Sequence, residues 1–522
     1  MSTQKRQRSV GGVRTADEYI EGLQDDRAVY YKGERIDDVT EHPATRGMIK
    51  SQGELFSLQH HEEHGNLLTY ESPSSGDPVS IFYQMPTSKE DLERRRKATK
   101  LWMDKTCGVA GRANDFLANG VTGMAIGKEH FQSEDHDHDF GQHVKDYYEY
   151  CRENDKCLTH ALVDPQIDRS EETGSSSFRL GDDNADRPGA VRKVDEDKDG
   201  IVVSGARMLA TLGPQADEIL VYPFGRYGEG EEDQALAFAV PADAHGVRQI
   251  CRPQLSRNDE RNHPLSSRFD EMDTFLVLDE VHVPWERVFV DGDIEVCNGW
   301  RDKMQTAYAG LTYHQTAVKD LAKAEFAFGV ALKLSESTGI DDYFHVESKL
   351  GEISTMITQI RGSILASEAE AYEFPDTDYV IPEPRHLFAV TASFPDMYPR
   401  IMQIIRDLGG SGLIGVPAWE DLEADAPLGG DVETYFRGKD MEADERLGVQ
   451  KLAYELAIDG LGGREELYER YYTGGPMRVK SNMYKNHPDK EEIKRRTMEN
   501  GLGDADLPTG SDDMTYAPAD DD

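Results

Sequence analysis

Two basic side chains in separate segments could together act on an aromatic ring. Arg112 follows the small-residue run from Cys107 to Gly111, and His160 opens the segment 160–169. A guanidinium stays positively charged, whereas an imidazole can accept or donate a proton near neutral pH. Such a pair could bind one phenol oxygen, stabilise it as phenolate, and prepare the ring for attack by an electrophilic oxygen. Arg112 and His160 are therefore our candidate catalytic and substrate-binding residues.

The composition indicates a large, soluble and very acidic protein. The chain has 522 residues, of which 38% are hydrophobic, enough for a sizeable core and two or three structural regions. Lysine and arginine number 58 against 99 aspartate and glutamate, a formal net charge of −41. This charge repels nucleic acid phosphates and anionic membranes, so we expect neither as a partner. We interpret the acidity as adaptation to high salt, the alternative being an ordinary acidic cytosolic protein.

Cysteine usage and the N-terminus predict a cytoplasmic location. The five cysteines are odd in number and irregularly spaced, which is not typical of a disulfide framework. Residues 1–12 are polar and basic, without the apolar stretch of a secretory signal. No apolar run approaches the length of a membrane-spanning helix.

The elements that must position the two candidates change in character along the chain. Near the N-terminus, Thr15 and Ser88 each precede acidic residues and predict helix starts. The segment 29–36 resembles a short hairpin with a Lys-Gly turn. Because the helical signal dominates up to about residue 148, we predict a mostly helical N-terminal domain.

The middle of the chain is rich in β-forming residues. Strands are predicted at 200–211, 218–224, 235–240 and 274–283, separated by polar, glycine-rich stretches. The Ser-, Asp- and Gly-rich segment 170–188 is predicted to be an exposed loop. This pattern favours an antiparallel β-barrel or sandwich.

Helical spacing returns after about residue 298. Long amphipathic helices are predicted at 306–335, 347–372, 394–408 and 447–461, which together indicate a helical bundle. Helix is expected to about Tyr472, and the Gly-Gly-Ser-Gly segment 409–412 is predicted to cap a helix.

We therefore predict an α+β fold in four parts. These are an N-terminal mostly helical domain (1–148), a central β domain (149–292), a C-terminal helical bundle (293–500) and an acidic disordered tail (501–522).

Several motifs in fixed order resemble one family. The chain is similar, from about residue 15 to residue 474, to the oxygenase components of 4-hydroxyphenylacetate 3-monooxygenase, which are two-component flavin-dependent aromatic hydroxylases with an acyl-CoA-dehydrogenase-like fold. No single motif is specific, but their joint order and spacing are. The matching segments are 31–43, 107–116, 160–169, 264–271, 283–286, 411–414 and 462–468.

The resemblance implies a reaction. FAD, reduced by a separate flavin reductase, would react with molecular oxygen to give a C4a-hydroperoxyflavin. This species would hydroxylate a phenol, such as 4-hydroxyphenylacetate, ortho to its hydroxyl and give a catechol. Arg112 and His160 would hold the phenol oxygen in a pocket that excludes water. By analogy, the protein would be a homotetramer that shares its flavin sites.

The resemblance also implies which residues contact the flavin. Glycines in the bundle would let the backbone approach the cofactor, although a helix C-cap is the alternative for Gly462 and Gly463. The implied contacts are Gln166, Ile167, Asp168, Arg169, Thr211, Gly462, Gly463 and Arg464.

Two departures from the family pattern concern the substrate. The family places a tyrosine four residues after the arginine, where this chain has Phe116, so one hydroxyl contact to the phenol is lost. In some members a loop closes over the substrate with hydroxyl side chains for its carboxylate. The corresponding segment 225–233 is acidic and lacks Ser and Thr, and Arg226 or Tyr227 could substitute.

Two alternatives remain. A dehydratase acting on 4-hydroxybutyryl-CoA shares the pattern but needs an iron–sulfur cluster held by three cysteines and a histidine. This chain offers Cys107 and His314, with Leu321 where a cysteine would stand. The second alternative is a catalytically silent flavin-binding protein of the same fold. We predict no metal site, because the acidic segment 195–200 lacks the last EF-hand ligand and the histidines of 136–143 have no fixed ligand spacing.

Overall fold

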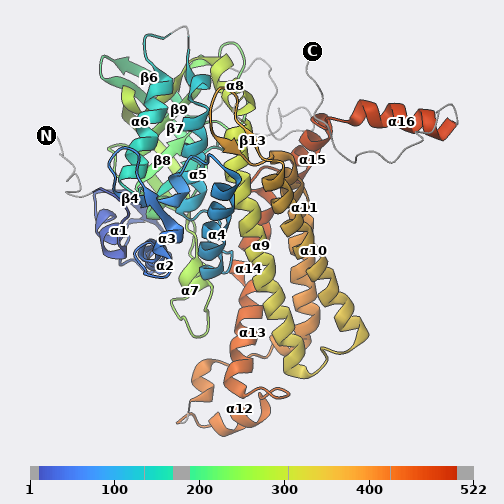
Figure 1. Cartoon of the computed structure of the whole chain (residues 1–522). Coiled ribbons are helices and arrows are strands. Elements are labelled where there is room, and N and C mark those ends of the chain that lie inside the picture. The colour runs from blue at the N-terminus through green and yellow to red at the C-terminus, as the bar shows by residue number, and fades with distance from the viewer. Residues whose placement is uncertain (1–10, 134–135, 168–188, 304, 424, 503–522) are drawn as a thin grey trace.

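The structure is a computed structural model that describes residues 11–133, 136–167, 189–303, 305–423 and 425–502. Figure 1 shows the N-terminal helices beside the β-strands, and the long C-terminal helices running down the other side of the molecule. The helices are α1 (Ala16–Gly22), α2 (Arg46–Leu58), α3 (Gly65–Leu68), α4 (Lys89–Lys105), α5 (Asn114–Ile126), α6 (Phe140–Glu153), α7 (Ser266–Phe269), α8 (Ile294–Lys303), α9 (Gln305–Thr338), α10 (Phe344–Ala369), α11 (Pro384–Gly409), α12 (Gly429–Tyr435), α13 (Ala443–Ala457), α14 (Gly460–Tyr471), α15 (Pro476–Lys485) and α16 (Lys490–Leu502).

The predicted N-terminal helix starts are confirmed. Thr15 caps α1 in a reciprocal capping box with Glu18, and the Ser88 side chain accepts a hydrogen bond from the Asp91 amide at the start of α4. The hairpin is also confirmed, since strands β1 (Ala28–Tyr31) and β2 (Glu34–Arg35) pair antiparallel. The N-terminal region also supplies β1 to the central sheet, where it runs parallel to β10.

Within the described residues, the central strands form two open sheets. One has the order β2-β1-β10-β11-β7-β6 and the other has the order β12-β9-β8-β5. The central strands are β5 (Leu158–Ala161), β6 (Arg192–Asp197), β7 (Gly200–Thr211), β8 (Glu218–Val221), β9 (Leu236–Pro241), β10 (Val247–Cys251), β11 (Asp273–Pro284) and β12 (Val288–Asp291), and the short peripheral pairs are β3 (Thr69–Glu71) with β4 (Pro78–Ser80) and β13 (Tyr372–Glu373) with β14 (Val380–Ile381).

The β region matches the predicted strands. Among the described residues both sheets are open, so of the two predicted forms the closed barrel is not formed, and the pairs β1–β10 and β5–β8 are parallel rather than antiparallel. The acidic segment 195–200 forms the turn between β6 and β7, where one Asp197 carboxylate oxygen accepts from the amides of Asp199 and Gly200. His160 therefore lies on β5, and Thr211 lies at the end of β7.

The bundle is built as predicted around α9, α10, α11 and α13, with two corrections. Helix α11 begins at Pro384 rather than at residue 394, with Pro395 and Pro399 inside it. Both prolines weaken a helix prediction, yet α11 buries Phe394 and Tyr398 against the bundle core, which holds the helix together. Beyond the predicted end at residue 472, helices α15 and α16 continue to Leu502.

Helix α5 joins the two main hydrophobic cores. All of its residues are buried, and it packs against α9 of the bundle and against β5 of the sheet. In the segment just before it, Val109 belongs to the bundle core and Ala110 to the core of the N-terminal helices and sheets. The segment that carries Arg112 therefore lies where the two cores meet.

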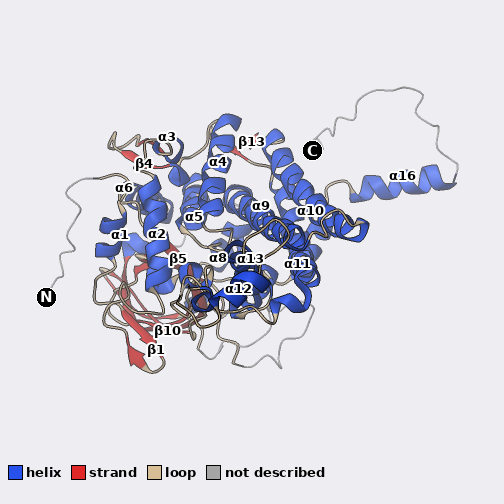
Figure 2. Cartoon of the chain, turned by 90° about the horizontal axis from the view of Figure 1, so that it is seen from below, coloured by secondary structure: helices blue, strands red, loops and turns tan. Residues whose placement is uncertain are grey.

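Helix α15 packs against α11, and α16 after it leaves the body of the molecule. Figures 1 and 2 both show α16 projecting away from the bundle, and none of its residues is buried. Among the described residues, no helix combines the length and apolarity needed to cross a membrane. The predicted loop 170–188 and the part of the predicted tail beyond residue 502 lie outside the described residues.

Candidate active site

The backbone before Arg112 needs glycine at two positions. Gly108 has φ +67°, and a Cβ there would lie 2.5 Å from the Lys323 backbone nitrogen on α9. A Cβ on Gly111 would lie 2.6 Å from the Tyr468 hydroxyl oxygen on α14. These close approaches fix the segment against both bundle helices and so fix the direction of Arg112.

Arg112 is buried but has little anionic compensation. Its backbone amide donates to a Glu271 carboxylate oxygen at 2.7 Å, while its side-chain Nη2 donates to the Tyr472 carbonyl at 3.1 Å. The guanidinium carbon lies 3.8 Å from the Phe116 ring centroid and 5.1 Å from that of Tyr472. Among the described residues, Nη1 is buried without a hydrogen-bond partner. A buried N–H of this kind is suited to an anionic ligand.

His160 lies within electrostatic reach of Arg112. The Phe116 ring packs edge-on to the His160 imidazole at 5.8 Å between centroids, and Arg112 lies over the same Phe116 ring. His160 Nδ1 is 3.0 Å from the Tyr222 hydroxyl. Burial, and secondarily the positive charge of Arg112, lower the pKa of His160 well below its ordinary value. The imidazole is therefore neutral at pH 7 and can accept a proton.

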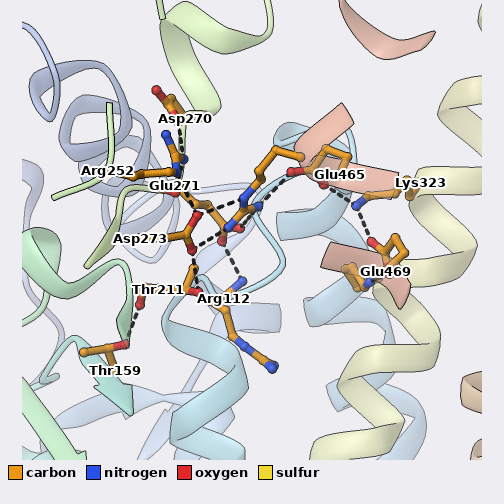
Figure 3. Close-up of polar contacts among 12 residues, drawn as sticks. Arg112, Thr159, Thr211, Arg252, Asp270, Glu271, Asp273, Lys323, Glu465 and Glu469 are labelled. Atoms are coloured by element: carbon orange, nitrogen blue, oxygen red, sulfur yellow. Dashed lines mark hydrogen bonds and ion pairs between the residues drawn. The ribbon is translucent and has the colours of Figure 1, made fainter. Parts of the chain in front are cut away.

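Thr211 and Arg464, two of the predicted flavin contacts, meet on one carboxylate. Thr211 Oγ1 donates to Asp273 at 2.7 Å, and Arg464 Nη2 donates to the same oxygen at 2.9 Å. Figure 3 shows this group beside Arg112, linked through Glu271, which accepts from the Arg112 amide and from Arg464 Nη1. Arg464 also binds Glu465 at 2.8 Å.

The charges of this network hold the Asp273 carboxylate ionised. Burial raises its pKa, but Arg464 and Arg252 outweigh burial and bring the pKa to about 2. For Glu271, which is also buried, burial prevails over the nearby Arg464 and raises the pKa. Thr211 is held in turn, since its carbonyl accepts a hydrogen bond from the Thr159 hydroxyl. The network therefore places bonded charged groups beside the Arg112 backbone.

A second buried network lies behind the tyrosines that face Arg112. On α9, Lys319 binds Glu469 at 2.5 Å, while Lys323 binds Glu465 at 2.6 Å and also contacts Glu469. Lys319 Nζ lies 4.4 Å from the ring centroid of Tyr472. These pairs fix α9 against α14 and hold Tyr468 and Tyr472 next to Arg112. Both tyrosine hydroxyls are buried without a hydrogen-bond partner among the described residues.

The other predicted flavin contacts are placed less closely together. Gln166 is exposed and Ile167 is 63% exposed, while Asp168 and Arg169 lie outside the described residues. Gly462 is buried in the first turn of α14, where a Cβ would lie 2.4 Å from the Leu456 carbonyl. Gly463 follows it and is open to solvent, so both glycines start a helix rather than cap the end of one.

The two predicted substrate residues of the acidic loop differ in exposure. Arg226 is exposed. Tyr227 is buried, with its backbone amide on the Asn298 side chain at 2.9 Å and its hydroxyl 3.4 Å from Arg207 Nη2. Tyr227 is therefore held within the fold.

Sequence reasoning missed the residues that support the pair. Glu271 ends a segment that carried the family resemblance, but its acid gave no signal of its own. Three more residues were missed: Asp273, Tyr222 and Tyr308. Each lies in or next to a predicted strand or helix, where a polar side chain is ordinarily assigned to the face that contacts solvent. The pairing of β7 with β11 brings Asp273 to the site, the pairing of β5 with β8 brings Tyr222, and the packing of α9 brings Tyr308.

The fold brings Arg112 and His160 to one aromatic ring, and comparisons with known families identify the class of protein. The 4-hydroxyphenylacetate 3-hydroxylase N-terminal family matches residues 15–290, and the C-terminal family of the same enzyme matches residues 303–498. The chain therefore belongs to the 4-hydroxyphenylacetate 3-hydroxylase family.

Individual relatives cover nearly the whole chain. The 4-hydroxyphenylacetate 3-monooxygenase oxygenase component of Thermus thermophilus is 37% identical over 489 residues, covering 92% of this chain and 97% of the relative. A 4-nitrophenol 2-monooxygenase oxygenase component from a Rhodococcus species is 30% identical, covering 88% and 86%. A crystal structure of the 4-hydroxyphenylacetate 3-monooxygenase oxygenase component with FAD and 4-hydroxyphenylacetate has a TM-score of 0.85 at 35% identity, covering 94% of this chain and 99% of that one.

The dehydratase alternative shares only the fold. An archaeal 4-hydroxybutyryl-CoA dehydratase structure has a TM-score of 0.80 at 21% identity. All five cysteines of this chain are free, and among the described residues no group that could hold a metal contains a cysteine. His314 binds Glu368 at 2.9 Å, and burial raises the pKa of Cys107 to about 11. A cluster needs gathered thiolates, so these residues do not support that reaction.

Proposed function

We propose that this chain is the oxygenase component of a two-component monooxygenase that hydroxylates a phenol ortho to its hydroxyl with reduced FAD and oxygen. The observation that carries the proposal is the buried Arg112 guanidinium, whose Nη1 has no partner among the described residues, together with the His160 imidazole, which contacts the same Phe116 ring. An arrangement of fixed cation and neutral base suits a phenol that must lose its proton before attack.

Each residue has a defined task toward the phenol. Arg112 stabilises the phenolate oxygen by charge, which makes the ring a better carbon nucleophile. His160 accepts the phenolic proton, because burial and Arg112 keep its imidazole neutral. Phe116 positions both groups through ring contacts and provides no hydroxyl for the phenol. Burial of all three excludes water from the reacting atoms.

The residues present fit FAD as the cofactor. The hydroxyls of Tyr468 and Tyr472 are buried polar atoms without partners among the described residues, as expected where a polar ligand completes the site. Thr211, Gln166 and Ile167, with the bundle residues Gly462, Gly463 and Arg464, would contact the flavin, and we include Asp168 and Arg169 from the sequence. When bound and reduced, FAD supplies the electrons that activate oxygen.

The substrate we propose is a phenol with few polar substituents. Phe116 provides no hydroxyl toward the substrate, and the acidic segment 225–233 disfavours a carboxylate. Exposed Arg226 is the group of that segment best able to bind a substrate carboxylate, with Tyr227 beside it. We keep 4-hydroxyphenylacetate among the phenols to be tested, because relatives of this chain are named 4-hydroxyphenylacetate 3-monooxygenase.

We further propose a homotetramer, served in the cytoplasm by a separate flavin reductase and adapted to high salt. Helix α16 has 13 residues and buries none of them, and an isolated helix of this length is marginal in water. Its exposed Ile493, Met498 and Leu502 would pack against another subunit. Light scattering at high and low salt tests this, and a monomer at high salt would contradict it.

The deciding experiment supplies chemically reduced FAD, air and a panel of phenols, and measures catechol and hydrogen peroxide. We expect catechol from at least one phenol, with Arg112→Ala as the inactive control. Flavin binding with peroxide as the sole product for every phenol would instead support the silent flavoprotein, which the missing hydroxyl at Phe116 favours.

A further inference from the structure

A short chain of hydroxyl groups leads away from His160. His160 Nδ1 lies 3.0 Å from the Tyr222 hydroxyl, and the Tyr222 and Tyr308 hydroxyls are 2.7 Å apart. The three residues come from β5, the end of β8 and α9. His160 and Tyr222 are buried, whereas Tyr308 is partly exposed. The chain therefore runs from the buried imidazole toward the surface.

His160 is a poor final acceptor for a proton. Protonation would place a buried imidazolium close to the Arg112 guanidinium, and among the described residues no carboxylate bonds to the imidazole. Burial comes first and Arg112 second in opposing that charge. A proton taken from the phenol must therefore move on for the phenolate to persist.

We propose that Tyr222 and Tyr308 relay the phenolic proton from His160 toward solvent, an inference that rests on the proposed function. The phenol O–H bond breaks as its proton binds Nε2 of His160. The proton on Nδ1 then moves to the Tyr222 oxygen, the Tyr222 proton moves to the Tyr308 oxygen, and Tyr308 gives its own proton to water. The net change is one proton moved from phenol to water, and each relay group regains its starting charge.

A purely structural role is the competing explanation. Buried tyrosine hydroxyls ordinarily find a hydrogen-bond partner, and Tyr222 could simply hold the His160 ring in place. The two roles predict different rates for a phenol that is already ionised. A relay is needed only for a phenol that arrives protonated, whereas a misplaced imidazole impairs every phenol alike.

The test compares Tyr222→Phe and Tyr308→Phe with wild type in single turnovers with reduced FAD. Tyr147→Phe is the matched control, because Tyr147 is buried, packs against Phe289 and has a hydroxyl without a hydrogen-bond partner among the described residues. With the fastest neutral phenol of the panel, both relay variants should lose about tenfold or more in the rate of catechol formation. The loss should shrink as the pH rises toward the pKa of that phenol, and should be small for 4-nitrophenol above its pKa.

A second measurement needs no variant. The wild-type rate with the neutral phenol should show a solvent deuterium isotope effect with a curved proton inventory, because several protons move together, and the ionised phenol should not. Rates of both variants within about twofold of wild type would overturn the relay, as would equal losses at every pH. If the wild-type protein forms catechol and both variants form it equally fast, the relay alone is contradicted. If no phenol gives catechol, the proposed function itself is contradicted.

Discussion

Arg112 and Arg464 are both largely buried, yet their surroundings differ. The Arg464 side chain is 12% exposed and binds three carboxylates, those of Asp273, Glu271 and Glu465. Arg112 is 8% exposed, and its guanidinium contacts aromatic faces and a single backbone carbonyl. The carboxylate nearest to Arg112, on Glu271, is bound by the Arg112 backbone amide instead.

The difference separates a cation whose charge carboxylates already neutralise, Arg464, from a cation whose charge is open to an anion, Arg112. Removing a charge from water is costly unless a partner compensates it. The carboxylates around Arg464 provide this compensation, and their ion pairs hold α14 to β11. Arg112 is stabilised only by weaker cation–π and dipolar contacts, which leaves its charge available to an anion. The lack of a bound carboxylate, together with burial, therefore distinguishes the candidate site arginine from Arg464, whereas burial alone does not.

The largest expected effect comes from removing Arg112. Arg112→Ala should lower the rate of phenol hydroxylation about 100- to 1000-fold, as the loss of a charge-stabilising donor does in other active sites. Its melting temperature and flavin binding should stay close to those of wild type. Single-turnover catechol formation measures the effect, and near-normal turnover would contradict the role of Arg112.

Removing Arg464, whose charge is already neutralised, should act mainly on stability. Arg464→Ala leaves Glu271, Asp273 and Glu465 buried without their common partner, so the free energy of unfolding should fall by about 3–5 kcal/mol. Arg470→Ala, on the exposed face of the same helix, is the control and should change it little. Equal stability of the two variants in urea unfolding would remove the distinction between Arg112 and Arg464.

Asp115 provides a pH-dependent test of the buried charges around the pocket. Burial raises its pKa to about 8, against a hydrogen bond from Gln315. The folded state therefore binds more protons than the unfolded state between the ordinary carboxyl pKa and about 8, so stability falls as pH rises through that window. Asp115→Asn should match wild type near the acidic end and be more stable at the alkaline end. Unfolding curves that remain parallel across this window would rule out an Asp115 contribution.

The smallest expected effect is a gain. Phe116→Tyr restores a hydroxyl beside Arg112 and His160, and should raise the ratio of catechol to peroxide a few-fold, roughly the value of one hydrogen bond. Both products are measured in the same reaction with a simple phenol. An unchanged ratio would mean that the hydroxyl at this position does not orient the phenol.

Local signals predicted much of the fold, because they lie within a few residues of one another. The Thr15 capping box, the hairpin at 28–35 and the strands of the central region depend on short spacings and are confirmed. Helix α11 shows the limit, since Pro395 suggests an ending that packing against the bundle overrides.

The site was predicted only where a motif marked it. Arg112 and His160 carried the resemblance, and the fold brings both to Phe116. Glu271 and Asp273, which engage Arg464, and the tyrosines beyond His160 lie far from their partners in the sequence. Nothing in their spacing reveals such contacts, which depend on the pairing of β5 with β8 and of β7 with β11 and on the packing of α9.

The most direct test of the Arg112 charge is the ionisation of a bound phenol. Phenolate absorbance of 4-nitrophenol, titrated against pH on the wild-type protein and on Arg112→Ala, reports that ionisation without any turnover. The guanidinium should lower the apparent pKa of the bound phenol below its value in water, and Arg112→Ala should abolish the shift. A bound pKa at or above the solution value in the wild-type protein would contradict the account.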